Sequence, residues 1–160
     1  MGKGFDFKCK NCNFSLSANL GIGFGYPNLC TKILDNIKNG TLGKELQEIA
    51  DNINNLAIYA SQDLYLCENC RDLSPELTIA LCSPLTDLPK SDRPFSSVCE
   101  CSESDTYVME YQLGTEYKTE LIIAYFCDKC KTKMTKVASY ENLECPHCRS
   151  VLDYEMSCWD

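Results

Sequence analysis

The residues with the clearest potential for chemistry in this 160-residue chain are its thirteen cysteines. Eight of them form four pairs with the spacing C-x-x-C: Cys9/Cys12, Cys67/Cys70, Cys127/Cys130 and Cys145/Cys148. A C-x-x-C turn directs both sulfur atoms toward one point, and two such turns that face each other form a tetrahedral site of four thiolates. The spacing therefore predicts two metal sites, each closed by four cysteines.

Zinc is the metal that we expect, as two structural ions. Iron is an alternative, because a rubredoxin-like electron carrier uses the same four-thiolate site. Rubredoxin knuckles usually carry a glycine after the second cysteine, whereas the residues at that position here are Asn13, Arg71, Lys131 and Arg149. These residues favour zinc over iron.

The chain length between the pairs predicts which of them share a metal. Fourteen residues separate the third pair from the fourth, close to zinc-ribbon spacing, and we expect a β-hairpin there at 133–138 and 141–145. The first and second pairs, fifty-four residues apart, would then form the other site. A cross-braced arrangement, such as the first pair with the third, remains an alternative.

The residues between the first two pairs have helical periodicity. One apolar stripe ends before Gly40 and consists of Leu29, Cys30, Ile33, Leu34 and Ile37. A second, with Thr41 as its N-cap, consists of Leu42, Leu46, Ile49, Ile53 and Leu56. This pattern predicts a helical hairpin, followed by strands at QDLYLC and ELTIALC.

We therefore expect an α+β fold with two small zinc-ribbon lobes. The first lobe would cover 1–84 and carry the helical insertion at about 28–60, a linker or long loop would cover 85–105, and the second lobe would cover 106–160. In the second lobe, DTYVMEYQL and TEYKTELIIAYFC flank Gly114 as a hairpin, and SVLDYEMSCW reads as a final strand. A core this small supplies no more than ~3–5 kcal/mol, whereas a structural zinc ion supplies ~10–16 kcal/mol, so we expect this lobe to need its metal.

The remaining cysteines and the single histidine show no catalytic arrangement. Cys30 lies on a helical stripe and is expected to be a small buried apolar residue. Cys82, Cys99, Cys101 and Cys158 could form a further site, although ordinary packing is the favoured interpretation. His147 lies between two predicted ligands and is expected to be an exposed knuckle residue. We therefore expect no catalytic residues, no bound organic cofactor and no enzyme activity.

Charge and hydropathy restrict the partners. The net charge of −8 becomes more negative by two with each closed zinc site, which disfavours nucleic acid. A cluster of lysines keeps nucleic-acid binding open as an alternative: Lys129, Lys131, Lys133 and Lys136. No apolar run reaches the roughly 18–20 residues that span a bilayer, and the N-terminal residues lack a signal-peptide core. We expect a cytoplasmic protein, away from membranes, with reduced thiols.

The first half of the chain resembles a known group of proteins. FKCKNC followed by ANLGIGFGYP, a helical insertion and YLCENC is similar to uncharacterised bacterial zinc-ribbon proteins with paired C-x-x-C knuckles. The resemblance covers roughly residues 1–80 and reaches the rest through CDKC and CPHC. It implies metal binding by all eight paired cysteines and no particular activity. The expected role is a non-catalytic zinc-binding protein that acts as a protein-interaction adaptor or regulatory module.

Overall fold

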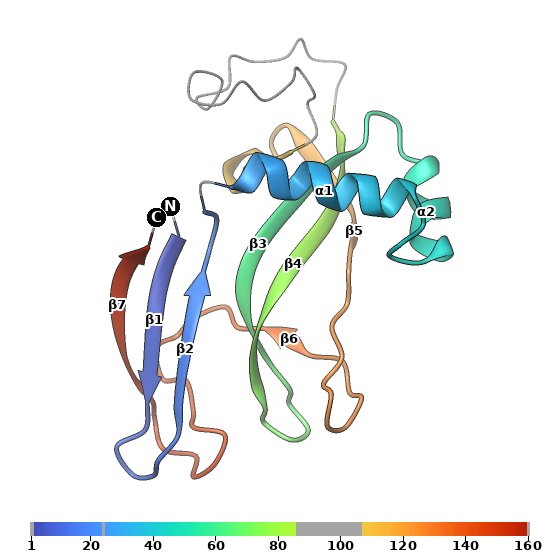
Figure 1. Ribbon diagram of the computed structural model, residues 1–160. Helices are drawn as coiled ribbons and strands as arrows, with labels where there is room; N and C mark the ends of the chain where they lie inside the picture. Colours follow the sequence, from blue (N-terminus) through green and yellow to red (C-terminus); the bar gives the residue numbers. More distant parts are fainter. Residues whose placement is uncertain (1, 24, 86–106, 160) are drawn as a thin grey trace. The chain divides into compact units, whose positions relative to one another are not determined.

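The computed structural model describes residues 2–23, 25–85 and 107–159, and it has a mixed α+β fold. The helices are α1 (Tyr26–Lys38), α2 (Lys44–Asp51) and a 3-10 turn at Glu110–Gln112. The strands are β1 (Gly2–Lys8), β2 (Ser15–Leu20), β3 (Ala57–Leu66), β4 (Leu73–Pro84), β5 (Tyr117–Ile122), β6 (Thr135–Lys136) and β7 (Asp153–Trp159). They form two antiparallel sheets with the orders β2-β1-β7 and β5-β4-β3-β6 (Figure 1). None of the helices described is long and apolar enough to cross a membrane.

The chain divides into two units, each built from separate segments. The first unit comprises 1–24, 61–78 and 123–160, and the second comprises 25–60 and 79–122. All eight paired cysteines belong to the first unit, whereas both helices belong to the second. The linker expected at 85–105 lies outside the described residues except for Leu85.

In the first unit, β1 is the central strand of a three-stranded sheet. It pairs antiparallel with β2, where Lys8 lies opposite Ser15, and antiparallel with β7, where Lys8 lies opposite Asp153. The final strand expected from the alternation in SVLDYEMSCW is confirmed as β7. Because β7 lies beside β1, the two ends of the described chain are neighbours (Figure 1).

A second strand pairing in the first unit follows the same plan. The last residues of β3, Tyr65 and Leu66, pair antiparallel with Lys136 and Thr135 of β6. The expected hairpin at 133–138 and 141–145 is wrong, since the short strand β6 pairs with β3, residues 141–142 form a turn and Glu144 bridges to Val151. Within KMTKVASYENLE the strand consists only of Thr135 and Lys136, and its hydrogen-bonding partner is β3.

Two apolar clusters fill the first unit. The larger consists of Phe5, Phe7, Cys9, Ala18, Leu20, Leu64, Leu73, Leu143, Cys145 and Leu152. The smaller consists of Tyr65, Cys67, Cys127 and Met134. Leu64 and Tyr65 are consecutive in β3, and because side chains alternate along a strand, β3 contributes to both clusters.

In the second unit, α1 buries one face as its periodicity predicts. The buried residues are Tyr26, Cys30, Ile33, Leu34 and Ile37, whereas Leu29 of the predicted stripe is only half-buried. Pro27 lies in the first turn, where a missing backbone N–H costs nothing, and Gly40 follows the helix with a φ of 70°. The hydroxyl of Tyr26 donates to the carbonyl of Val108 and accepts from the backbone N–H of Ala60. The prediction that Cys30 is buried is confirmed.

The second predicted helix is too long. Helix α2 ends at Asp51, and Ala57 to Ala60 belong to β3 instead. Its N-cap is Gly43, not Thr41, and Leu42 and Ile49 are 43% and 36% exposed. The last two residues of the predicted stripe, Ile53 and Leu56, lie in the turn between α2 and β3.

The hairpin expected around Gly114 is also wrong. YKTELI does form a strand, β5, but it pairs with β4, where Ala80 lies opposite Ile122. The preceding segment forms the 3-10 turn at Glu110–Gln112, and Gly114 adopts a positive φ of 79° that closes it.

Candidate metal centres

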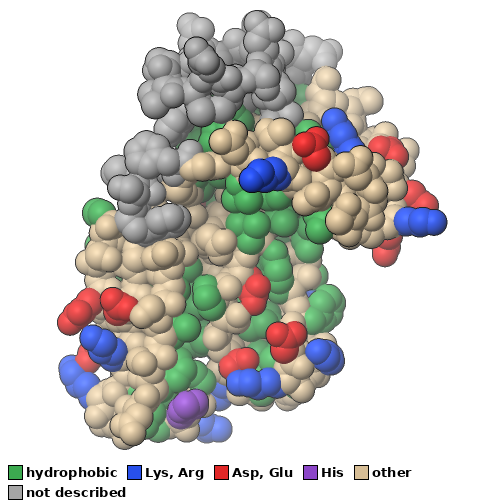
Figure 2. Space-filling view, in the orientation of Figure 1, with side chains coloured by type: hydrophobic (Ala, Val, Ile, Leu, Met, Phe, Trp, Pro, Cys, Tyr) green, Lys and Arg blue, Asp and Glu red, His purple; other side chains and the backbone are tan. Residues whose placement is uncertain are grey.

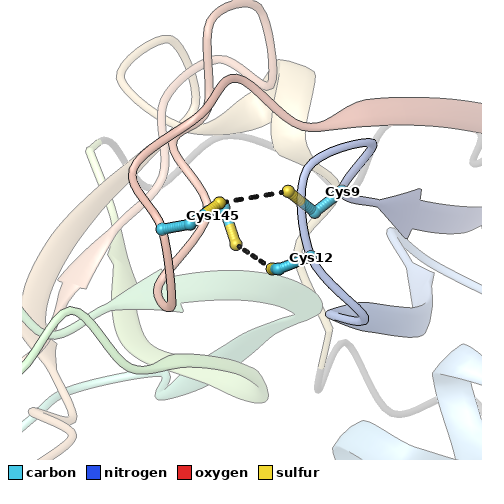
Figure 3. Close-up of side chains that lie close together, drawn as sticks. Cys9, Cys12 and Cys145 are labelled. Atoms are coloured by element: carbon cyan, nitrogen blue, oxygen red, sulfur yellow. Dashed lines mark hydrogen bonds between the residues drawn. The ribbon is translucent and has the colours of Figure 1, made fainter.

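The structure brings the eight paired cysteines together in two groups of four. The outer cage consists of Cys9, Cys12, Cys145 and Cys148. The inner cage consists of Cys67, Cys70, Cys127 and Cys130. Figure 3 shows Cys9 and Cys12 on the loop after β1, with Cys145 on the facing loop. The predicted pairing of adjacent C-x-x-C turns is wrong: the first turn meets the fourth, and the second meets the third.

Strand direction explains this nested pairing. The first turn follows the end of β1 and the fourth precedes the start of β7, and in an antiparallel pair these two ends coincide. The second turn follows the end of β3 and the third precedes the start of β6, so the same relation holds there. Pairing of distant strands therefore outweighs the short chain between the third and fourth turns.

The sulfur positions fit a tetrahedral metal ion. In the outer cage the Sγ atoms of Cys9 and Cys148 are 3.3 Å apart, and those of Cys12 and Cys145 are 3.5 Å apart. All Sγ atoms of each cage lie within 4.8 Å of one another. A tetrahedral zinc site with bonds of about 2.3 Å places its sulfurs about 3.8 Å apart, within this range.

The inner cage has the same dimensions. Its Sγ–Sγ distances are 3.4 Å for Cys67 and Cys130, 3.3 Å for Cys70 and Cys127, and 3.8 Å for Cys70 and Cys130. No disulfide joins any of the cysteines that the structure describes. The two groups could therefore hold two metal ions.

A repeated backbone pattern shapes the turns. The N–H of the first cysteine donates to the carbonyl five residues later in all four, with distances of 2.8–3.0 Å. In three turns the N–H that follows the second cysteine donates back to the carbonyl of the first cysteine: Arg71 to Cys67, Lys131 to Cys127 and Arg149 to Cys145. These bonds close each turn and hold its two sulfurs on the same side.

The residues that replace the usual glycine keep its conformation. Arg71, Lys131 and Arg149 have φ values of 62°, 58° and 66°, in the left-handed region that favours glycine. The knuckle geometry therefore forms without glycine, at a cost in backbone strain. All three residues are basic and directly follow the second cysteine of their turn.

The pKa values of the thiols differ within each cage. Hydrogen bonds from the side chain and backbone of Thr132 lower the pKa of Cys130 to about 5. The side chain and backbone of Ser150 likewise lower the pKa of Cys148 to about 6. The hydroxyl donors next to these two cysteines therefore prepare thiolates, the form that binds metal.

The partner thiols keep their protons. The backbone N–H of Phe14 lowers the pKa of Cys12, but burial and neighbouring thiols outweigh it and raise the pKa to about 12. The pKa of Cys70 also rises to about 12, because the thiol of Cys127 and burial outweigh the backbone N–H of Asp72. Metal binding would displace these protons.

Burial follows the order of the cysteines in each turn. The first cysteines are buried in the two apolar clusters: Cys9, Cys67, Cys127 and Cys145. The second cysteines are half-buried or exposed: Cys12, Cys70, Cys130 and Cys148. Each cage is thus anchored in the core and open to solvent on its other side.

Side chains connect the facing turns of each cage. In the outer cage Asn11 donates to the hydroxyl of Ser150 at 2.7 Å, and the Phe14 ring contacts the ring of His147 edge-on at 5.1 Å. In the inner cage Lys129 pairs with Asp72 at 2.7 Å. His147 is exposed, as predicted for a knuckle residue.

Cys30, Cys82 and Cys158, the described cysteines outside the cages, belong to neither group of four. Cys82 is buried and Cys158 is exposed, while Cys99 and Cys101 lie outside the described residues. Burial raises the pKa of Cys30 to about 12 and that of Cys82 to about 11. These two thiols therefore stay protonated and behave as small apolar side chains.

The comparisons with known proteins identify no relative of this chain. No protein-family model, curated protein or solved structure matches the chain. The function is therefore inferred from the geometry of the cages.

Proposed function

We propose that this protein is a non-catalytic zinc-binding protein that acts as a protein-interaction adaptor or regulatory module. The observation that carries the proposal is the closed set of four sulfurs in each cage. A catalytic zinc ion keeps one position for water or substrate, and a fourth cysteine would occupy that position. Eight unoxidised thiols also agree with a reducing compartment such as the cytoplasm.

Zinc is the proposed occupant, as two structural ions. The four-sulfur set suits zinc, and iron shares this preference, so the geometry alone supports both metals. The αL residues after the second cysteines are basic rather than glycine, and their side chains would offset the double negative charge of a zinc site with four thiolates. A rubredoxin-like iron site is the alternative.

A protein partner is proposed because of the exposed apolar side chains near the C-terminal strand. Val151 and Met156 are 55% and 59% exposed, and Tyr154 is 41% exposed. The strand that carries two of them, β7, lies at the edge of its sheet. Apolar side chains on an edge strand are suited to contact with another protein.

Nucleic-acid binding has weaker support. Within the lysine cluster, Lys129 pairs with Asp72, Lys131 with Asp128 and Lys136 with Asp63, at 2.7, 3.9 and 2.9 Å. On the face shown in Figure 2, basic and acidic side chains lie beside one another. Paired lysines contribute less to phosphate binding, since each already neutralises a carboxylate.

The first test is the metal content of protein expressed without metal supplementation, with its visible absorption spectrum. Two zinc ions per chain and no colour support the proposal. Bound iron and a red chromophore would instead support the electron-transfer alternative. Folded protein without any metal would contradict both the zinc proposal and the iron alternative.

The adaptor role needs a second test. Affinity purification from the native host would compare the wild-type chain with a Val151→Ser/Met156→Ser variant of equal metal content. A partner retained by the wild type and lost by the variant supports the role. No difference between the two overturns the role of this surface, and binding that requires nucleic acid favours the alternative function.

A further inference from the structure

The two cages are joined by a short segment of the first unit. Residues 131–144 leave the third turn, which belongs to the inner cage, and enter the fourth turn, which belongs to the outer cage. Met134 is buried with Cys67 and Cys127 of the inner cage. Leu143 is buried in the cluster that contains Cys9 and Cys145. The segment is thus fixed at both ends by side chains that pack against opposite cages.

Strand β3 holds the middle of this segment. The backbone N–H of Val137 donates to the carbonyl of Leu64 at 2.8 Å, directly after the two residues of β6 that pair with β3. Lys136 pairs with the buried carboxylate of Asp63 at 2.9 Å. Asp63 also accepts a hydrogen bond from Thr78 at 2.6 Å. These contacts fix the position of the segment along β3.

A direct contact also joins the two cages. Arg71 follows Cys70 of the inner cage, and its guanidinium pairs with the carboxylate of Glu144, which precedes Cys145 of the outer cage. The backbone of Arg71 is held in the left-handed conformation, and its N–H donates to the carbonyl of Cys67. The position of this guanidinium consequently depends on the geometry of the inner cage.

From these contacts we infer that the two cages bind metal cooperatively, coupled through the Arg71–Glu144 pair and the 131–144 segment. Metal in the inner cage fixes the second and third turns. The second turn then places Arg71 against Glu144, and the third turn sets the start of the segment that ends at Cys145. Part of the conformational entropy that the outer cage must lose in order to bind metal is therefore lost before its own metal binds. Since coupling is reciprocal, metal in the outer cage strengthens the inner cage by the same factor.

This inference rests on the proposed metal binding but not on the adaptor role. Its test therefore needs the occupancy of each cage separately. The full-length protein is equilibrated at buffered free zinc concentrations and treated briefly with an alkylating reagent. Mass spectrometry then measures protection of Cys12 and Cys148 for the outer cage, and of Cys70 and Cys130 for the inner cage. The second cysteines are suitable reporters, because they are the solvent-facing sulfurs of each cage.

Loss of the inner cage is the first comparison. In the wild type we expect both cages to become protected over the same range of free zinc. In the Cys70→Ser/Cys130→Ser variant, half-protection of the outer cage should require zinc at least about fivefold higher. The reciprocal Cys12→Ser/Cys148→Ser variant should weaken the inner cage by the same factor. Unchanged protection in either variant overturns the inference.

The second comparison breaks the contact while keeping all eight cysteines. Arg71→Gln should raise the zinc needed by the outer cage about twofold to fivefold, the range of a partly exposed ion pair. Lys118→Gln is the control, because Lys118 also forms an exposed ion pair, with Glu120, but belongs to the second unit, which contains no cage cysteine. Lys118→Gln should leave the outer cage unchanged. An equal effect of both variants overturns the role of the contact.

A double-mutant cycle completes the test. If Arg71 acts through Glu144, the Arg71→Gln/Glu144→Gln double variant should show a smaller effect than the two single changes predict by addition. Strict additivity overturns the pairwise link. Failure of the inference and of the proposed function are distinguishable: chains that bind two zinc ions independently contradict only the coupling, whereas chains that bind none contradict both.

Discussion

The Sγ atoms of Cys9 and Cys148 lie 3.3 Å apart, although 139 positions separate the two residues along the chain. The contact follows from the antiparallel pairing of β1 with β7, which brings the turn after one strand to the turn before the other. A metal ion bound there would link two turns that lie close to opposite ends of the described chain. Closing so long a loop restricts the unfolded chain strongly, which is one way in which such a site stabilises a small fold.

The nested pairing of the turns predicts which double variants lose one metal ion and which lose two. Cys9→Ser/Cys148→Ser removes two ligands from the outer cage and should leave one zinc ion per chain. Cys9→Ser/Cys70→Ser removes one ligand from each cage and should reduce the binding of both ions.

Native mass spectrometry of the intact protein measures both stoichiometries. The pairing of adjacent turns would give the reverse result, since Cys9 and Cys70 would then share a site. The structure would be contradicted if the Cys9→Ser/Cys70→Ser variant kept one tightly bound ion while the Cys9→Ser/Cys148→Ser variant bound both ions weakly.

Arg149→Gly should stabilise the metal-loaded protein by about 0.5–1 kcal/mol. Arg149 has a φ of 66°, which strains any residue with a Cβ atom, and glycine removes this strain at a smaller cost in chain entropy. Chemical denaturation at saturating zinc measures the change. Asn13→Gly is the control, because Asn13 holds the equivalent place in the first turn without a positive φ; a similar gain there would contradict the explanation.

Thr132→Val should make the inner cage lose zinc at a higher pH. Thr132 lowers the pKa of Cys130 to about 5, so its hydrogen bonds favour the thiolate that binds metal. A lowered pKa in the folded protein adds stability above the unfolded pKa, and this stability disappears as the pH falls through about 5. Without the hydroxyl the pKa of Cys130 rises, and protons displace zinc sooner.

The pH midpoint of zinc release, followed with a colorimetric chelator, measures the shift. The matched control is Ser150→Ala, which removes the corresponding hydroxyl beside Cys148 and should shift the midpoint of the outer cage more than that of the inner cage. An inner-cage midpoint that is unchanged by Thr132→Val would show that this hydroxyl has no effect on the site.

Lys136→Met should destabilise the protein by about 1–3 kcal/mol. Asp63 is 8% exposed, and its carboxylate accepts hydrogen bonds from Lys136 and Thr78. Removal of the ammonium group leaves a buried carboxylate with one fewer partner, which costs roughly this amount. Thermal unfolding at saturating zinc measures the loss, and Lys133→Met serves as the control in the same lysine cluster. Equal effects of the two changes would argue against a special role for the Asp63 pair.

The turns and their cysteines could be predicted from the sequence, because their geometry is local. C-x-x-C spacing is sufficient to direct two sulfurs to one side, and the hydrogen bonds of each turn involve residues at most five positions apart. The alternation in SVLDYEMSCW and the stripe from Cys30 to Ile37 likewise identified β7 and α1, because each records the burial of one face.

The choice of partner for each turn was decided by the tertiary structure alone. Whether Cys145 meets Cys9 or Cys127 depends on which strand β7 joins, and no local signal in the chain records that register. The same is true of β6, whose two residues are a strand only because β3 offers its edge. Strand pairing is a long-range hydrogen-bonding choice among several compatible edges, whereas a knuckle is a short-range property of its own few residues.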